Sequence, residues 1–121
     1  MAQISIIVEF ETQEGREEEF TSLMKDHARR TLAEEPGCLR FEVLKIVDPE
    51  GAPVPGLVMV NELYADKAAL AQHRGNPRMG GLRNAYTPMI KTRRLIIAEV
   101  LSDAGEEKGL TPAQLNASND G

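Results

Sequence analysis

Glu62 and His73 are the two side chains of this 121-residue chain whose types and positions best suit proton transfer. Glu62 alternates with Val58, Val60 and Tyr64, so the period-2 pattern of a strand places all four on one face. A carboxylate in such apolar surroundings either pairs with a base or has a raised pKa. The alternative is an ordinary ion pair with a surface Lys or Arg.

His73 follows Ala69 and Leu70 at helical spacing, which directs its ring from a helix toward the sheet. Histidine takes up and releases a proton near neutral pH because its unperturbed pKa is about 6.5. We expect Glu62 and His73 to form an acid/base pair, although a lone histidine on an apolar face is often only a core residue. His27, on the apolar side of an earlier helix, is interpreted as structural or as facing a dimer partner.

Four further residues are candidates for substrate binding. Tyr64 could donate a hydrogen bond to a substrate oxygen, and Phe41 and Tyr86 could form an aromatic wall. Met79 lies in the segment Asn76–Gly81, whose Gly80-Gly81 pair makes it a candidate gate. Packing in the core is the alternative for each of the three aromatic residues.

Arginine is frequent in the last third of the chain and could bind phosphate, because guanidinium matches phosphate in a bidentate manner. Solvated surface charge is the alternative for most of these residues. The chain has no Cys/His spacing typical of zinc, no phosphate-binding glycine loop and no nucleophile-elbow motif. The arginines considered are Arg74, Arg78, Arg83, Arg93 and Arg94.

Four strands and at least two helices are needed to position these side chains. Alternation predicts strands, 3.6-residue periodicity predicts helices, and Pro and Gly mark their ends. Pro36-Gly37 should end the first helix, and Asp66 should cap the second. The predicted order is strand 3–11, helix from Gly15 to about Glu35, strand 38–47, loop 48–56, strand 57–64, helix after Asp66, short irregular helix within 75–89, and strand 90–101.

Composition restricts the partners that the chain can have. A net charge of -5 and a 41% apolar content fit one acidic domain that binds a small molecule, and they argue against nucleic acid or an anionic membrane. One cysteine, Cys38, and the lack of a long apolar run predict a reduced, cytoplasmic protein. We expect a domain at 1–101 and a polar tail at 102–121. Leu110 and Leu115 of the tail could dock on a partner subunit.

The strands at 3–11 and 57–64 are apolar on both faces, although two helices can cover only one face of a four-stranded sheet. A monomer would expose a large apolar patch. We therefore expect a homodimer in which two sheets oppose each other. Coverage of the second face by the tail or by the proline-rich loop of the same chain is the alternative.

Residues 3–101 resemble the antibiotic-biosynthesis-monooxygenase (ABM) family. The resemblance is carried by the strand end and acidic helix start between Glu9 and Phe20, the run Glu35-Pro36-Gly37-Cys38-Leu39-Arg40-Phe41, and Asn61-Glu62-Leu63-Tyr64 followed by Ala69 and His73. It implies an α+β, ferredoxin-like βαββαβ fold with a four-stranded antiparallel sheet, assembled as a dimeric α+β barrel. It also implies chemistry without metal, flavin or nicotinamide, so no cofactor is expected.

The family resemblance implies three possible functions. The first is a cofactor-independent monooxygenase acting on a hydroxy-aromatic or quinol-like molecule. The second is an isomerase of a phosphorylated keto-sugar of the autoinducer-2 type, and the run from Leu39 to Leu44 is similar to that branch. The third is a non-catalytic dimeric ligand-binding module. The haem-degrading members of the family rely on a pocket tryptophan. This chain has no tryptophan, which argues against haem degradation. Inward-facing arginines would favour the isomerase and an apolar pocket the oxygenase.

Overall fold

The computed structural model describes residues 2–102, and its elements follow the predicted βαββαβ order. The expected docking of Leu110 and Leu115 therefore lies outside the described residues. Of the helices described, none has both the length and the apolar composition needed to cross a bilayer. The elements are β1 (Ile4–Thr12), α1 (Glu17–Glu34), β2 (Cys38–Val47), β3 (Pro53–Tyr64), α2 (Lys67–Arg74), α3 (Arg78–Tyr86), the 3-10 helix η1 (Thr87–Met89) and β4 (Ile90–Glu99).

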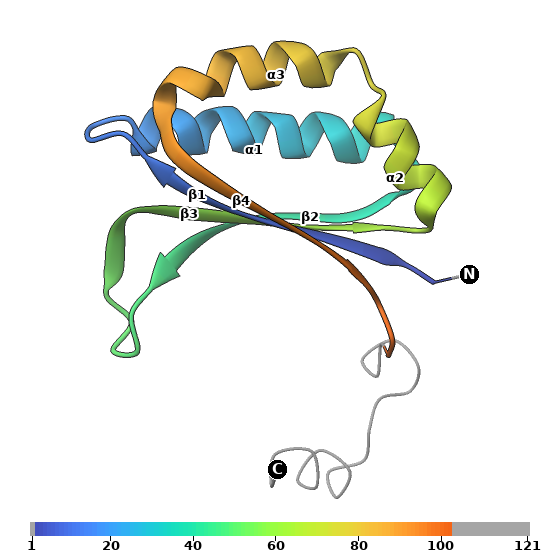
Figure 1. Cartoon of the computed structure of the whole chain (residues 1–121), viewed down its shortest axis with the longest axis horizontal. Helices are drawn as coiled ribbons and strands as arrows, with labels where there is room; N and C mark the ends of the chain where they lie inside the picture. Colours follow the sequence, from blue (N-terminus) through green and yellow to red (C-terminus); the bar gives the residue numbers. More distant parts are fainter. Residues whose placement is uncertain (1, 103–121) are drawn as a thin grey trace, which may run out of the picture.

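The four strands form one antiparallel sheet in the order β2-β3-β1-β4, which confirms the ferredoxin-like α+β fold. Figure 1 shows α1 and α3 packed side by side over one face of this sheet, with α2 at one end. We call this the inner face and the opposite one the outer face. No described helix covers the outer face.

The alternation of β1 shows how the sequence divides these two faces. Its residues alternate between buried and half-buried from Ile4 to Thr12. The inner residue Val8 is 7% exposed, whereas the outer residue Ile7 is half-buried and pairs with Ile96 of β4. β3 lies between β2 and β1 and is a central strand, as its two apolar faces predicted.

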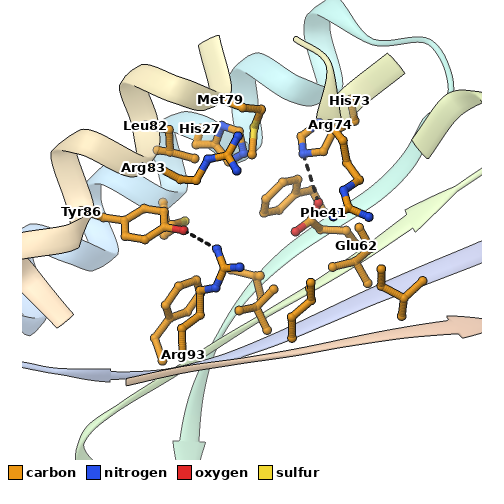
Figure 2. Close-up of a pocket in the computed structure, with 17 residues that line it drawn as sticks. His27, Phe41, Glu62, His73, Arg74, Met79, Leu82, Arg83, Tyr86 and Arg93 are labelled. Atoms are coloured by element: carbon orange, nitrogen blue, oxygen red, sulfur yellow. Dashed lines mark hydrogen bonds and ion pairs between the residues drawn. The ribbon is translucent and has the colours of Figure 1, made fainter. Parts of the chain in front are cut away.

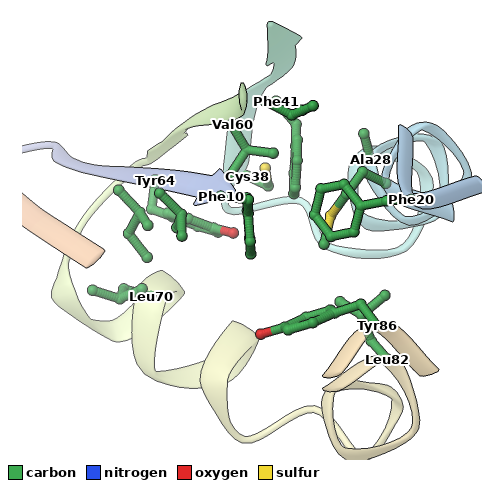
Figure 3. Close-up of a cluster of buried hydrophobic side chains, with 14 of the residues drawn as sticks. Phe10, Phe20, Ala28, Cys38, Phe41, Val60, Tyr64, Leu70, Leu82 and Tyr86 are labelled. Carbon is green, nitrogen blue, oxygen red and sulfur yellow. The ribbon is translucent and has the colours of Figure 1, made fainter. Parts of the chain in front are cut away.

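An aromatic cluster joins the helices to the inner face (Figure 3). The ring of Phe10 on β1 lies 4.7 Å from that of Phe20 on α1 and 5.6 Å from that of Tyr86 on α3. Tilted and edge-on contacts at these distances stabilise the packing beyond simple burial of area. The cluster therefore fixes α1 and α3 relative to the sheet.

The predicted helix ends are confirmed. α1 ends at Glu34, and the carboxylate of Asp66 accepts a hydrogen bond from the backbone N–H of Ala69 over 2.8 Å at the start of α2. This cap satisfies one of the free N–H groups of the first turn. It fixes where α2 begins and so the direction in which His73 projects.

Two strand boundaries differ from the prediction by more than one residue. β3 begins at Pro53, inside the segment predicted as a loop, because Nζ of Lys45 donates to the carbonyls of Val54 and Leu57 and holds it against β2. The backbone N–H of Gly56 donates to Glu17 on α1 over 2.7 Å. β4 ends at Glu99, before the predicted Leu101, which is 93% exposed.

Candidate functional site

A cavity of about 120 Å³ lies between the inner face and the three helices (Figure 2). For comparison, an apolar cavity of about 150 Å³ holds a benzene molecule. The space is therefore about the size of one ring or a short carbon chain, and a larger molecule would extend past Leu95 and Ile97 of β4, which line it and are 40% and 46% exposed. The wall consists of Ile6, Val8, Phe10, Met24, His27, Phe41, Val60, Glu62, His73, Arg74, Met79, Leu82, Arg83, Tyr86, Arg93, Leu95 and Ile97.

Glu62 projects from the central strand β3 into the floor of this cavity. Its Oε1 accepts a hydrogen bond from the hydroxyl of Tyr64. Its Oε2 has no hydrogen-bond partner within residues 2–102. This atom keeps some accessible surface, so it retains access to the cavity. Burial raises the pKa of Glu62 to about 7, the Tyr64 hydrogen bond opposes this shift and the nearby Glu35 adds to it.

His73 projects from α2 to the same floor and is 3% exposed. Its Nε2 lies 3.6 Å from Oε1 of Glu62, and its Nδ1 lies 2.9 Å from Oε1 of Glu35. The structure thus brings the two residues of the predicted acid/base pair together at one cavity. Because a carboxylate only accepts, Nδ1 of His73 carries the proton that binds Glu35.

Glu35, which follows α1, belongs to the site, although the sequence placed it only at a helix end and in the run that carries the family resemblance. It binds His73 through Oε1, and its Oε2 accepts hydrogen bonds from Asn76 and Arg78, each over 3.2 Å. The carboxylate of Glu35 therefore connects the end of α1 with α2 and the start of α3. These bonds tether the first half of the segment 76–81 that was considered as a gate.

The other predicted substrate-binding residues fall into two groups. Phe41, Tyr86 and Met79 line the cavity. Tyr64 does not line it, because it is fully buried behind Glu62. Burial and the adjacent Glu62 raise the pKa of Tyr64, so its hydroxyl stays a donor to the carboxylate.

Three of the five arginines considered from the sequence line the cavity and two do not. Arg74, Arg83 and Arg93 come from α2, α3 and β4 and line the cavity (Figure 2). Within residues 2–102 none of the three forms an ion pair, although Nη1 of Arg93 donates to the hydroxyl of Tyr86 over 2.7 Å. Arg78 lies in the Glu35 network and Arg94 pairs with Glu9 at 3.7 Å, so neither reaches the cavity.

His27 on α1, interpreted from sequence as structural or dimer-facing, lies in the cavity wall. Its ring is 5.3 Å from that of Phe41 and 5.7 Å from that of His73. Burial and the neighbouring Arg78 lower the pKa of His27 to about 4, so it is neutral at physiological pH. Helical spacing correctly placed it on the buried face of α1, but its neighbours come from distant parts of the chain.

No set of three His, Cys, Asp or Glu side chains between residues 2 and 102 is arranged to hold a metal ion. Cys38 is buried, and burial raises the pKa of its thiol to about 11. It is therefore a neutral thiol and a poor nucleophile at physiological pH.

The fold and the site define a small α+β protein with a buried carboxylate-histidine pair at a partly open cavity. Residues 3–84, more than half of the chain, match the sequence profile of a family described as antibiotic biosynthesis monooxygenase. The chain belongs to this family. A comparison with curated proteins returned no significant match.

Solved structures share the fold of this chain. A candidate antibiotic biosynthesis monooxygenase from Caulobacter crescentus CB15 has a TM-score of 0.72 and 24% identity, over 84% of this chain and 92% of that one. A candidate antibiotic biosynthesis monooxygenase from Nitrosomonas europaea has a TM-score of 0.71 and 20% identity, over 82% and 99%. A conserved protein from Methanosarcina mazei Go1 has a TM-score of 0.69 and 21% identity, over 81% and 92%. At these identities the likeness establishes the shared fold.

Proposed function

We propose that the chain is a cofactor-independent enzyme in which Glu62 takes a proton from a small molecule bound in the cavity. The observation that carries this proposal is the position of Glu62, whose free Oε2 faces the cavity while His73 and Tyr64 flank Oε1. A base acts best when its pKa is close to the working pH. The pKa of about 7 meets that condition.

His73 would receive or return the proton that Glu62 takes. Its Nδ1–H is bound by Glu35, so Nε2, which faces Glu62, is the ring nitrogen that can accept a proton. Oε2 takes the proton, whereas Oε1 is the atom 3.6 Å from Nε2, so transfer requires the carboxyl group to turn and to approach Nε2 to hydrogen-bond distance. Glu35 holds the ring in the tautomer that this transfer needs.

The reaction that we place first is monooxygenation of a hydroxy-aromatic or quinol-like molecule. Loss of the proton gives an electron-rich anion, which transfers an electron to dioxygen and then forms a carbon–oxygen bond with the resulting superoxide. Protonation of the peroxide and loss of water leave one oxygen atom in the product as a carbonyl. The apolar and aromatic wall would orient the ring and exclude bulk water from these steps.

A second candidate is the isomerase of a phosphorylated keto-sugar. The observation that favours it is the convergence of Arg74, Arg83 and Arg93 on the cavity, in a chain whose net charge is -5. Guanidinium groups without a carboxylate partner suit a phosphate or another anion. Glu62 and His73 would then remove a proton from one carbon and return it to the adjacent carbon through an enediolate, with no net oxidation.

Oxygen uptake and proton exchange distinguish these reactions. With 1,4-naphthohydroquinone as a probe under ¹⁸O₂, the oxygenase should produce hydroxynaphthoquinone that contains one ¹⁸O atom, and chelation should not change the rate. With D-ribulose 5-phosphate in D₂O, the isomerase should introduce deuterium next to the carbonyl. Glu62→Gln should reduce the active reaction at least 100-fold, whereas Glu50→Gln in an exposed turn should not.

Binding without either reaction would contradict the proposal and would support a non-catalytic ligand-binding module. NMR shift changes at Phe41 and Tyr86 would report such binding. Full activity of Glu62→Gln would also contradict the assigned base. The distinction between the two candidate reactions depends only on which probe turns over.

We also propose that the chain forms a homodimer through the outer face of its sheet. Ile7, Met59, Leu63 and Ile96 lie on this face and are half-buried, and no described helix covers them. A contiguous apolar face on a soluble protein usually has a partner, and twofold pairing is the commonest arrangement.

A further inference from the structure

His27 has a second ring nitrogen that the described contacts leave unexplained. The side chain is almost fully buried, and its Nδ1 lies 2.8 Å from Nη1 of Arg78. Its Nε2 has no hydrogen-bond partner within residues 2–102, and this atom keeps some accessible surface. Nε2 is therefore open to solvent space at the edge of the ring opposite Arg78.

The contact with Arg78 determines which nitrogen of His27 carries the proton. A guanidinium group has only donors and stays charged at any ordinary pH. Nδ1 must therefore accept with its lone pair, which leaves the single proton of the neutral ring on Nε2. This tautomer follows from the chemistry of the partner.

Arg78 is itself held in place. Its Nη2 lies 3.2 Å from Oε2 of Glu35 and 3.5 Å from the hydroxyl of Thr31, and its side chain is only 14% exposed. A guanidinium with this many contacts cannot turn away to let the His27 ring invert. The tautomer is therefore a fixed property of the folded chain.

The open Nε2 belongs to the cavity. The His27 ring lies next to the rings of Phe41 and His73, and both of these line the cavity. Arg78 does not line it, so the Nδ1 edge of the imidazole faces away from the cavity and the Nε2 edge faces toward it. Figure 2 shows His27 on the helix side and Glu62 on the sheet side of the same space.

We propose that His27 is a second catalytic histidine, whose Nε2–H donates a hydrogen bond to the substrate oxygen that becomes negatively charged when Glu62 takes the proton. This role rests on the proposed function, but it is the same for the phenolate of the oxygenase reaction and the enediolate of the isomerase reaction. A preorganised donor aimed at developing charge is often the largest single contribution to a rate. The neutral ring does not compete with Glu62 for the proton.

The two cavity histidines therefore carry the proton of the neutral ring on opposite nitrogens, Nδ1 in His73 and Nε2 in His27. His73 lies between the carboxylates of Glu35 and Glu62 and presents a lone pair, whereas His27 lies against a guanidinium and presents an N–H. Glu35 links them, because one of its oxygens binds His73 and the other binds Arg78. One carboxylate thus fixes both tautomers.

The tautomer can be measured on the free protein by ¹⁵N NMR of the imidazole rings. We expect an unprotonated Nδ1 and a protonated Nε2 for His27, with no titration from pH 5.5 to 8. The charged and titratable groups that face this ring are Arg78, His73, Arg30 and Asp26. A protonated Nδ1 would overturn the inference, whatever the activity.

Binding of 4-nitrophenol tests the donor role without requiring turnover, because its ionised form absorbs visible light. The bound phenol should ionise at lower pH in the wild type than in His27→Leu, by about 1 to 2 pH units. His27→Gln keeps an N–H at the same position and should remain within about half a unit of the wild type. Equal values for the wild type and both variants would overturn the inference.

Turnover separates this inference from the proposed function. With whichever probe reacts, His27→Leu should lower kcat about 100- to 1,000-fold with little change in KM, and His27→Gln should recover most of it. If Glu62→Gln retains full activity while the 4-nitrophenol shift is observed, the proposed base is wrong and the donor stands. If Glu62→Gln is inactive while His27→Leu retains full kcat, the donor is wrong and the base stands. Thermal unfolding of each variant checks that it is folded.

Discussion

Nε2 of His73 and Oε1 of Glu62 lie 3.6 Å apart, and both groups are almost completely removed from solvent. The two residues come from a helix and from the strand that precedes it, and the Asp66 cap between them determines the turn that brings them together. Tyr64 occupies Oε1 and so leaves Oε2 for a ligand. The pair is therefore arranged so that one carboxyl oxygen contacts protein groups and the other contacts the cavity.

Glu62→Gln should make the protein more stable at alkaline pH. The pKa of Glu62 is raised from 4.5 to about 7 in the fold, so its contribution to stability is fully present below pH 4.5 and is lost as pH rises through 7. Relative to the wild type, Glu62→Gln should gain about 3 kcal/mol between pH 4.5 and pH 8.5. Urea unfolding of both proteins at the two pH values measures this difference, and Glu50→Gln should show none.

His27→Gln should have the opposite pH dependence. The pKa of His27 is lowered from 6.5 to about 4, so its contribution to stability is present above pH 6.5 and is lost as pH falls through 4. His27→Gln should gain about 3 kcal/mol relative to the wild type between pH 7.5 and pH 3.5. A difference that is independent of pH in urea unfolding would mean that His27 titrates normally.

The fold could be predicted from the sequence because its signals are local. Alternation placed Glu62 and Tyr64 on the buried face of a central strand, and helical spacing placed His73 and His27 on buried helix faces. Each of these patterns depends on neighbours within about eight residues. The start of β3 at Pro53 could not be predicted in this way, because Lys45 and Glu17 hold the segment through side-chain contacts.

The cavity could be predicted only in part, for the same reason. The roles of its residues depend on contacts between positions far apart in the sequence. Glu35 binds His73 across 38 positions, and Arg78 binds His27 across 51. Glu35 was noted as part of a family motif, but nothing in the sequence indicated its two partners. The sequence analysis considered the five arginines as a group, and only the fold separates Arg74, Arg83 and Arg93 from Arg78 and Arg94.

Gly37→Ala should displace α2 and destabilise the protein by about 1 to 3 kcal/mol. A Cβ at Gly37 would lie 2.4 Å from Cβ of Ala69, which is a severe overlap in a packed core. Because α2 carries His73, the His73–Glu62 distance should also change and activity should fall. Unfolding experiments measure the loss of stability.

A double-variant cycle checks the cause of this loss. Ala69→Gly removes the opposing methyl group, so it should recover most of what Gly37→Ala loses, apart from about 1 kcal/mol for a glycine inside a helix. Gly80→Ala is the matched control, since nothing lies within 4 Å of its added Cβ and α3 should be slightly stabilised. Additive effects of Gly37→Ala and Ala69→Gly would exclude the proposed contact.

The proposed dimer can be tested with two neighbouring residues of β4 that point to opposite faces. Ile96 pairs with Ile7 on the outer face, whereas Ile97 pairs with Ile6 and lines the cavity on the inner face. Wild-type protein should sediment with about twice the chain mass of 13.3 kDa. Ile96→Lys should be a monomer, because a buried lysine without a partner costs several kcal/mol in an apolar interface. Ile97→Lys adds the same charge one residue away and should remain a dimer. A wild-type monomer at micromolar concentration, or equal dissociation of both variants, would show that the outer face is not the interface.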